Sequence, residues 1–175
     1  ASSYSTDLKL ELMATGENSG TWGTKTNTNL NLIQQAIAGY EAISIAGGAQ
    51  TTALAMTNAT ISNARNAVIK FTGTITGNQI VTIPDSIEKV YIIENATSGA
   101  YTVQFKTVSG TGITWAATDK GHRILYADGT NVVDSETITQ DAIQTLNNKT
   151  LESPKIGTGL LDANGAESIK FTATG

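Results

Sequence analysis

The chain has 175 residues and a mass of 18.2 kDa, and 15% of its residues are charged, where a typical soluble domain has about 25%. Threonine, glycine, asparagine and alanine replace the charges, which favours strands and tight turns and indicates a structural or assembly protein. The net charge is −4 and no basic run is present, which argues against nucleic-acid binding. The lack of cysteine excludes disulfides, and the lack of a long apolar run argues against membrane insertion.

Residues 1–40 predict an arm followed by one helix. Apolar residues alternate in the arm, which predicts a short strand or an extended segment at Leu8, Leu10 and Leu12. In "TWGTKTNTNLNLIQQAIAGY" apolar residues recur at spacings of three and four, so a helix is predicted with one stripe of Trp22, Thr26, Leu30, Ile33 and Ile37. Gly39 is the expected stop, and either Thr21 or Thr24 would cap the start.

From residue 41 to residue 135 the period of the apolar residues changes to two. Nine short strands are predicted within EAISIAGG, QTTALAM, NAVIKFTGTI, NQIVTIP, KVYIIENAT, AYTVQFKTV, GITWAA, HRILYAD and NVVDS. Glycine-containing turns separate them. Strict alternation, as at Tyr101, Val103 and Phe105, indicates a sheet with one buried face. The expected fold is therefore mainly β, an antiparallel β-sandwich or barrel-like domain with the helix at its N-terminal end.

Residues 136–175 have too few apolar side chains to offset the entropy lost on ordering. A short helix is predicted in "SETITQDAIQTL", followed by strand-like pairs and turn dipeptides. Spaced Ile, Thr, Leu and Phe argue against disorder, so we expect burial between identical chains about one axis, as in a homotrimer. The interface residues expected in this extended, intertwined shaft segment are Leu146, Leu151, Ile156, Ile169 and Phe171.

No group of residues in the sequence forms a recognisable catalytic or cofactor motif, so we expect no enzyme activity, cofactor or metal. His122 is the single histidine and lies beside Arg123, which favours a surface or interface position. Carboxylates that would serve glycoside cleavage are scattered: Glu11, Glu17, Asp85, Glu88, Glu94, Asp119 and Asp128. Asp134, Glu136 and Asp141 lack the spacing of a calcium loop and favour a solvated junction. Trp22 and Trp115 would suit sugar stacking, although a core or interface position is favoured.

Five stretches resemble the tail fibre proteins of short-tailed bacteriophages of marine bacteria. "LKLELMATGENSGTWGTKTNTNLNLIQQAI" is similar to the opening of those fibres, and "YIIENATSGAYTVQFKTVSGTGITW" with "ILYADGTNVVDS" resembles their β-rich anchor domain. "TLNNKTLESPKI" and "LDANGAESIKF" resemble segments that recur along their shafts. Residues 44–66 contribute least to the resemblance.

The resemblance implies a homotrimeric virion protein that attaches a fibre to the phage tail for host recognition. Residues 1–40 would dock on tail adaptor or nozzle proteins, residues 41–135 would form the anchor domain, and residues 136–175 would begin the shaft. A host receptor would be contacted by distal parts. The helix stripe would carry the trimer or tail contacts. Two alternatives stay open, namely a carbohydrate-binding β-sandwich module and a capsid decoration protein.

Overall fold

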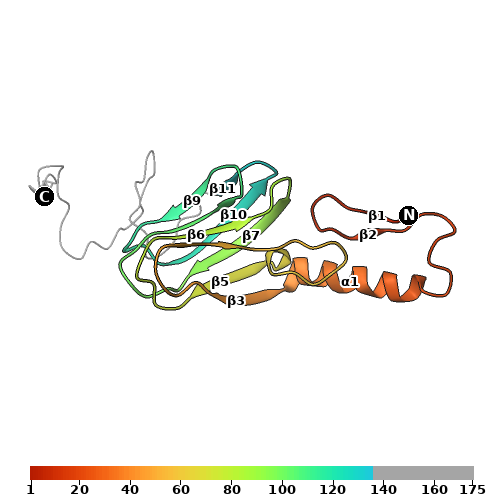
Figure 1. The fold of residues 1–175 in the computed structure, drawn as a ribbon, viewed down its shortest axis with the longest axis horizontal. Coiled ribbons are helices and arrows are strands. Elements are labelled where there is room, and N and C mark those ends of the chain that lie inside the picture. The colour runs from red at the N-terminus through yellow and green to blue at the C-terminus, as the bar shows by residue number, and fades with distance from the viewer. Residues whose placement is uncertain (136–175) are drawn as a thin grey trace, which may run out of the picture. The chain divides into compact units, whose positions relative to one another are not determined.

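The computed structural model describes residues 1–135, which belong to one compact unit (Figure 1). The described elements are β1 (Ser3–Tyr4), β2 (Glu11–Leu12), α1 (Trp22–Ala38), β3 (Tyr40–Ser44), β4 (Gln50–Ala53), the 3₁₀ turn η1 (Asn63–Arg65), β5 (Val68–Thr72), β6 (Gln79–Ile83), β7 (Glu88–Asn95), β8 (Val103–Thr107), β9 (Gly112–Trp115), β10 (Gly121–Asp128) and β11 (Val132–Asp134). The prediction of a mainly β protein with one N-terminal helix is confirmed. The predicted helix and shaft within 136–175 lie outside the described residues.

Two large sheets face each other across a common core, and β1 and β2 form a separate small hairpin (Figure 1). One large sheet has the order β11-β10-β7-β5-β3 and the other has the order β4-β6-β8-β9. From β3 to β8 the chain changes sheet after every strand. A strand therefore pairs with the one that comes two elements later, and all four such pairs are parallel. From β3 to β8 the chain thus winds as a coil, and each turn of the coil contributes one strand to each sheet.

This pairing corrects the prediction of an antiparallel sandwich or barrel. Antiparallel pairing in the two sheets is limited to β7 with β10, β10 with β11, and β8 with β9. All nine predicted strands exist, but the turns between them make two kinds of connection. Gly47-Gly48, Gly77-Asn78 and Ser98-Gly99 connect strands of different sheets, whereas Ser109-Gly110 and Asp128-Gly129 close hairpins. Glycine permits a sharp change of direction in both situations, so the turn residues do not reveal the partner strand.

Successive turns of the coil stack through polar side chains at a fixed offset. Ser98 Oγ donates to Thr74 Oγ1 over 2.9 Å, and the Thr102 amide donates to Asn78 Oδ1 over 3.1 Å. The Ser109 amide donates in the same way to Asp85 Oδ1 over 3.0 Å. Each pair is separated by 24 residues, as are the strand partners in β5–β7 and β6–β8. Stacked turns are thus one physical use of the abundant Thr, Ser and Asn.

The core is built from the inward-facing alternate residues of both sheets. Its largest buried side chains include Phe71, Tyr91, Phe105 and Trp115. The Phe105 ring centroid lies 6.0 Å from that of Phe71 and 5.6 Å from that of Tyr91, in the second case edge to face. Each such side chain contributes roughly 1.5–3 kcal/mol on burial. The period-two alternation in the sequence therefore identified Val103 and Phe105 correctly, but not Tyr101, which precedes β8 and is exposed.

Helix α1 ends where the chain has no room for a side chain. A Cβ on Gly39 would lie 2.3 Å from the Gln35 carbonyl oxygen and 2.4 Å from Asn66 Oδ1. The Gly39 amide donates to that Gln35 oxygen and the chain then enters β3 in an extended conformation. Gly39 is thus confirmed as the stop. At the start, Thr21 is the cap residue, but its side chain makes no capping bond and donates to the Asn18 carbonyl.

The N-terminal arm is only partly the predicted strand. Lys9 has φ of +53°, so the backbone turns between Leu8 and Leu10 and the alternation predicted through Leu12 is interrupted. β2 therefore covers only Glu11–Leu12, paired with β1. Positive φ at a residue other than glycine is uncommon, and the sequence contains no signal for it at Lys9.

Candidate functional site

The described residues contain no group of three or more histidine, cysteine, aspartate or glutamate side chains able to hold a metal ion. His122 is exposed on the outer face of the five-stranded sheet, opposite Glu94. Most of the scattered carboxylates are engaged in structural contacts, for example Glu94 with Lys70 at 2.9 Å and Asp119 with Arg123 at 2.6 Å. Within residues 1–135 the carboxylates therefore stabilise turns and strand pairs.

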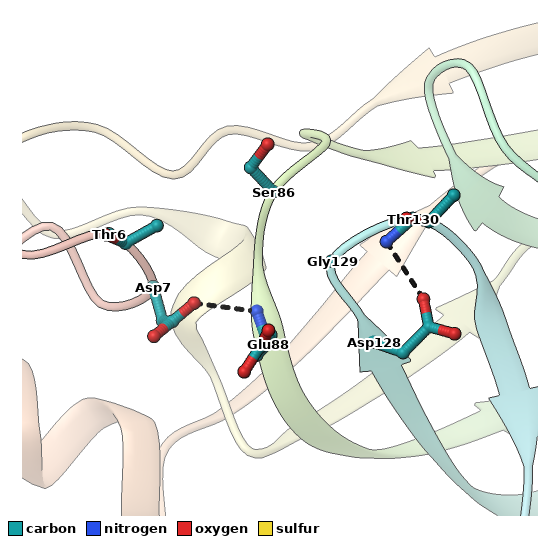
Figure 2. A pocket seen from close by; sticks show the side chains of 7 residues that line it. All are labelled: Thr6, Asp7, Ser86, Glu88, Asp128, Gly129 and Thr130. Atoms are coloured by element: carbon teal, nitrogen blue, oxygen red, sulfur yellow. Dashed lines mark hydrogen bonds between the residues drawn. The ribbon is translucent and has the colours of Figure 1, made fainter.

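A polar depression of about 470 Å³ lies where the arm meets two turns of the body (Figure 2). It is lined by Thr6, Asp7, Ser86, Glu88, Asp128, Gly129 and Thr130. Asp7 Oδ1 accepts a hydrogen bond from the Glu88 amide over 2.9 Å. Asp128 Oδ1 accepts from the amides of Asn131 and Thr130, and these bonds lower the pKa of Asp128. Two of the three carboxylates, those of Asp7 and Asp128, thus accept hydrogen bonds from backbone amides. Through Asp7 the arm contacts the body at this depression.

A second depression, of about 290 Å³, lies beside the C-terminal half of α1. It is lined by Asn31, Gln34, Gln35, Ala38, Gly39 and Ile61. Neutral amide side chains dominate this lining, so it offers hydrogen bonds without a charge. It has no pair of groups suited to acid–base or nucleophilic chemistry.

The most unusual feature of the described region is the apolar stripe on α1. The exposed fractions are 66% for Trp22, 57% for Leu30 and 75% for Ile37, and Ile33 is half-buried. The buried residue of the helix, Leu32, is about 120° around the helix from the centre of the stripe, at about 100° per residue. Three large apolar side chains are therefore presented to solvent on a face separate from the inward face.

Polar contacts fix which face of α1 turns inward. Asn29 pairs with the Glu11 backbone, donating to its carbonyl over 2.8 Å and accepting from its amide over 3.0 Å. Lys25 Nζ lies 2.9 Å from Glu11 Oε2, and this contact raises the pKa of Lys25 and lowers that of Glu11. These contacts hold the helix against the arm and so direct the apolar stripe away from it.

Arg65 joins the arm, the helix and the body from a fully buried position. Its guanidinium donates to the carbonyls of Leu8, Thr57 and Thr60 and to the side-chain oxygen of Gln35. All four acceptors are neutral, and burial lowers the pKa of Arg65. An arginine has several donors in one rigid plane, so it can bind segments that are distant in the sequence. Arg65 did not stand out in the sequence, because its acceptors are mostly backbone.

The apolar positions of α1 have coiled-coil spacing. Leu30 and Ile37 are seven residues apart and Ile33 lies three after Leu30, as the a and d positions of a heptad do. Leucine or isoleucine at a with isoleucine at d favours three or four parallel helices over two. This spacing covers one heptad, because the preceding a and d positions are Gly23 and Thr26.

The structure places the sequence-predicted interface residues in two groups. Trp22, Leu30, Ile33 and Ile37 share one helix face as predicted, whereas Leu146, Leu151, Ile156, Ile169 and Phe171 lie outside the described residues. Trp115 is fully buried, with the Arg123 guanidinium 5.3 Å from its ring centre, so it cannot stack on a sugar in this fold. Within residues 1–135 no helix is long and apolar enough to cross a membrane.

Comparison with family models, with curated proteins and with solved structures finds no match to this chain. Inference about its function therefore depends on the surface just described and on the sequence motifs.

Proposed function

We propose that this protein is a virion structural protein, the tail-proximal anchor region of a homotrimeric bacteriophage tail fibre. The observation that carries the proposal is the heptad spacing of Leu30, Ile33 and Ile37 on α1, where Leu30 and Ile37 are exposed and Ile33 is half-buried. Three identical helices packed in parallel would bury this seam and satisfy closed cyclic symmetry. The resemblance of the N-terminal and β-rich segments to tail fibres supplies the biological setting.

The body suits a mechanical role. Its strands are tied by parallel ladders in both sheets, and its turns are stacked by side-chain hydrogen bonds. A chain with few long charged side chains loses less side-chain entropy when its surface is buried in an assembly. In the proposed assembly the end of α1 that carries Trp22 docks on tail adaptor or nozzle proteins, and distal parts of the fibre reach the host receptor.

The trimer is tested by native mass spectrometry of the full chain at micromolar concentration. We expect a species three times the chain mass of 18.2 kDa. Ile37→Asp places a charge in the seam and is expected to give the monomer, whereas Asn31→Asp, at an exposed b position of the same helix, is expected to leave the trimer intact. Circular dichroism confirms that both variants keep the helix. A wild-type chain that stays monomeric would refute the proposal.

The location of the protein on the particle separates a fibre anchor from a capsid decoration protein. Antibody labelling of intact virions is expected to mark the tail. Labelling spread over the capsid would contradict the anchor role while leaving the trimer unaffected.

A further inference from the structure

The outer face of the five-stranded sheet carries a second set of exposed apolar residues. In the register of the sheet, Tyr40, Val68, Ile92 and Ile124 form one row across β3, β5, β7 and β10. Val90, Tyr126 and Val133 form the adjacent row across β7, β10 and β11. We call these seven residues the sheet patch. The exposed fraction is greatest at Val90, at 63%, and the patch contains no charged side chain.

The outer face of the other large sheet has the opposite chemistry. Its rows are Thr51–Ile80–Gln104–Thr114 and Ala53–Thr82–Lys106–Gly112. Five of these eight residues carry hydroxyl, amide or ammonium groups, and all of them except Thr82 are at least partly exposed. Both outer faces belong to the same coiled fold and cover the same core. Since one of them is mostly polar, folding alone does not require the sheet patch to be apolar.

The sheet patch begins directly after the apolar stripe of α1 in the sequence. Only Ala38 and Gly39 separate Ile37, the last residue of the heptad seam, from Tyr40 in the patch. β3, β5 and β7 are parallel, and the patch occupies their first rows, at the end of the sheet that follows the helix. The charged row of Lys70, Glu94 and His122 lies farther along the same strands. The apolar surface is therefore continuous in the chain from helix to sheet.

The helix seam alone is short for a stable assembly. α1 has 17 residues, about two and a half heptads, and helices of this length are marginal without further packing. The strongly exposed side chains of the stripe and the patch together present on the order of 800 Å², taking about 200 Å² for each whole side chain. Each partner in an interface of standard size buries about 800 Å². In a threefold assembly each chain divides this surface between two neighbours, about 400 Å² toward each, so the stripe and the patch together come closer to that size than either does alone.

We propose that the sheet patch packs against the same face of neighbouring copies of this chain, as the continuation of the α1 seam along the threefold axis. The inference rests on the proposed homotrimer and adds a second contact to it. Uncharged, β-branched and aromatic surface is suited to a contact between identical chains about a threefold axis, because no like charges are brought together.

The lack of cysteine in the chain allows a direct test with single-cysteine variants. Ile92→Cys lies in the patch, and Ile80→Cys lies on the outer face of the other sheet. The two isoleucines are matched, with exposed fractions of 37% and 36% on the inner strands β7 and β6. In the assembled protein we expect maleimide to label Ile92→Cys at least about tenfold more slowly than Ile80→Cys. Adding Ile37→Asp should equalise the two rates.

Each result bears on a different claim. Trimers in which both cysteines react at the same rate would overturn the sheet-patch interface and leave the α1 trimer standing. A chain that is monomeric by native mass, with equal rates, would overturn both. If Ile92→Cys does not fold, Tyr126→Cys, on β10 in the same patch, gives the same comparison.

Discussion

The two parts of the described region are held together by different forces. The body, residues 40–135, has an apolar core between two sheets, in which the Phe105 ring packs against Phe71 and Tyr91. The arm and helix, residues 1–38, bury Leu32 outside that core cluster and depend on polar contacts of Asn29, Lys25 and Arg65. The body thus carries its own stabilising burial, whereas the helix leaves its best apolar residues in solvent.

The largest expected effect is on the core of the body. Phe105→Ala removes a ring that contacts both Phe71 and Tyr91 and is expected to lower the free energy of unfolding by about 3–5 kcal/mol. Gln104→Ala, on the outward side of the same strand, is the control and should change it by less than about 1 kcal/mol. Urea unfolding measures both. Equal losses would show that the body is not stabilised mainly by this core.

The next effect distinguishes the arm and helix from the body. Arg65→Met leaves four oxygen acceptors in different segments without their buried donor and should weaken docking of the arm by about 2–3 kcal/mol. Hydrogen exchange is expected to accelerate in residues 8–12 and in α1, while amides of β6 and β8 stay protected. Arg65→Lys keeps the charge but loses the planar donor set, so an intermediate effect is expected. Uniform acceleration across the body would contradict this division.

The smallest effect is a pH dependence within the body. Burial lowers the pKa of Lys89 from 10.5 to about 8, although its ammonium lies 4.0 Å from the Tyr91 ring centre and donates to the Asn66 carbonyl. Below pH 8 Lys89 is protonated in both the folded and the unfolded state, and its buried charge destabilises the folded state. Between pH 8 and 10.5 only the unfolded state holds the proton, so stability rises with pH. Burial also raises the pKa of Tyr91 from 10.0, which acts in the opposite direction at higher pH.

The measurement compares wild type with Lys89→Met by thermal unfolding from pH 7 to 9.5. The wild type should gain about 1–2 kcal/mol relative to the variant over this range. Parallel curves for the two proteins would mean that Lys89 is not appreciably desolvated.

Local pattern predicted much of this protein. Alternation identified all nine strands of the body, and the three- and four-residue spacing of Leu30, Ile33 and Ile37 identified the helix and the exposed stripe. These predictions succeed because burial of one face is encoded in residues close together in the chain. The sheet patch carried a weaker signal, since "VYII" in β7 is apolar on both faces, and such a run also suits a strand buried on both sides.

Three features depend on the tertiary structure alone. They are the strand partners, the role of Arg65 and the burial of Trp115. The residues of a turn set a change of direction but not the sheet that receives the next strand, so parallel coiling was taken for antiparallel hairpins. Arg65 acts through carbonyls that every residue possesses, and Trp115 is buried because it ends β9 facing the core cluster. The sequence by itself determined which faces are apolar, because that property is local. Only the folded chain determined what those faces meet, because contacts between distant residues depend on every connection between them.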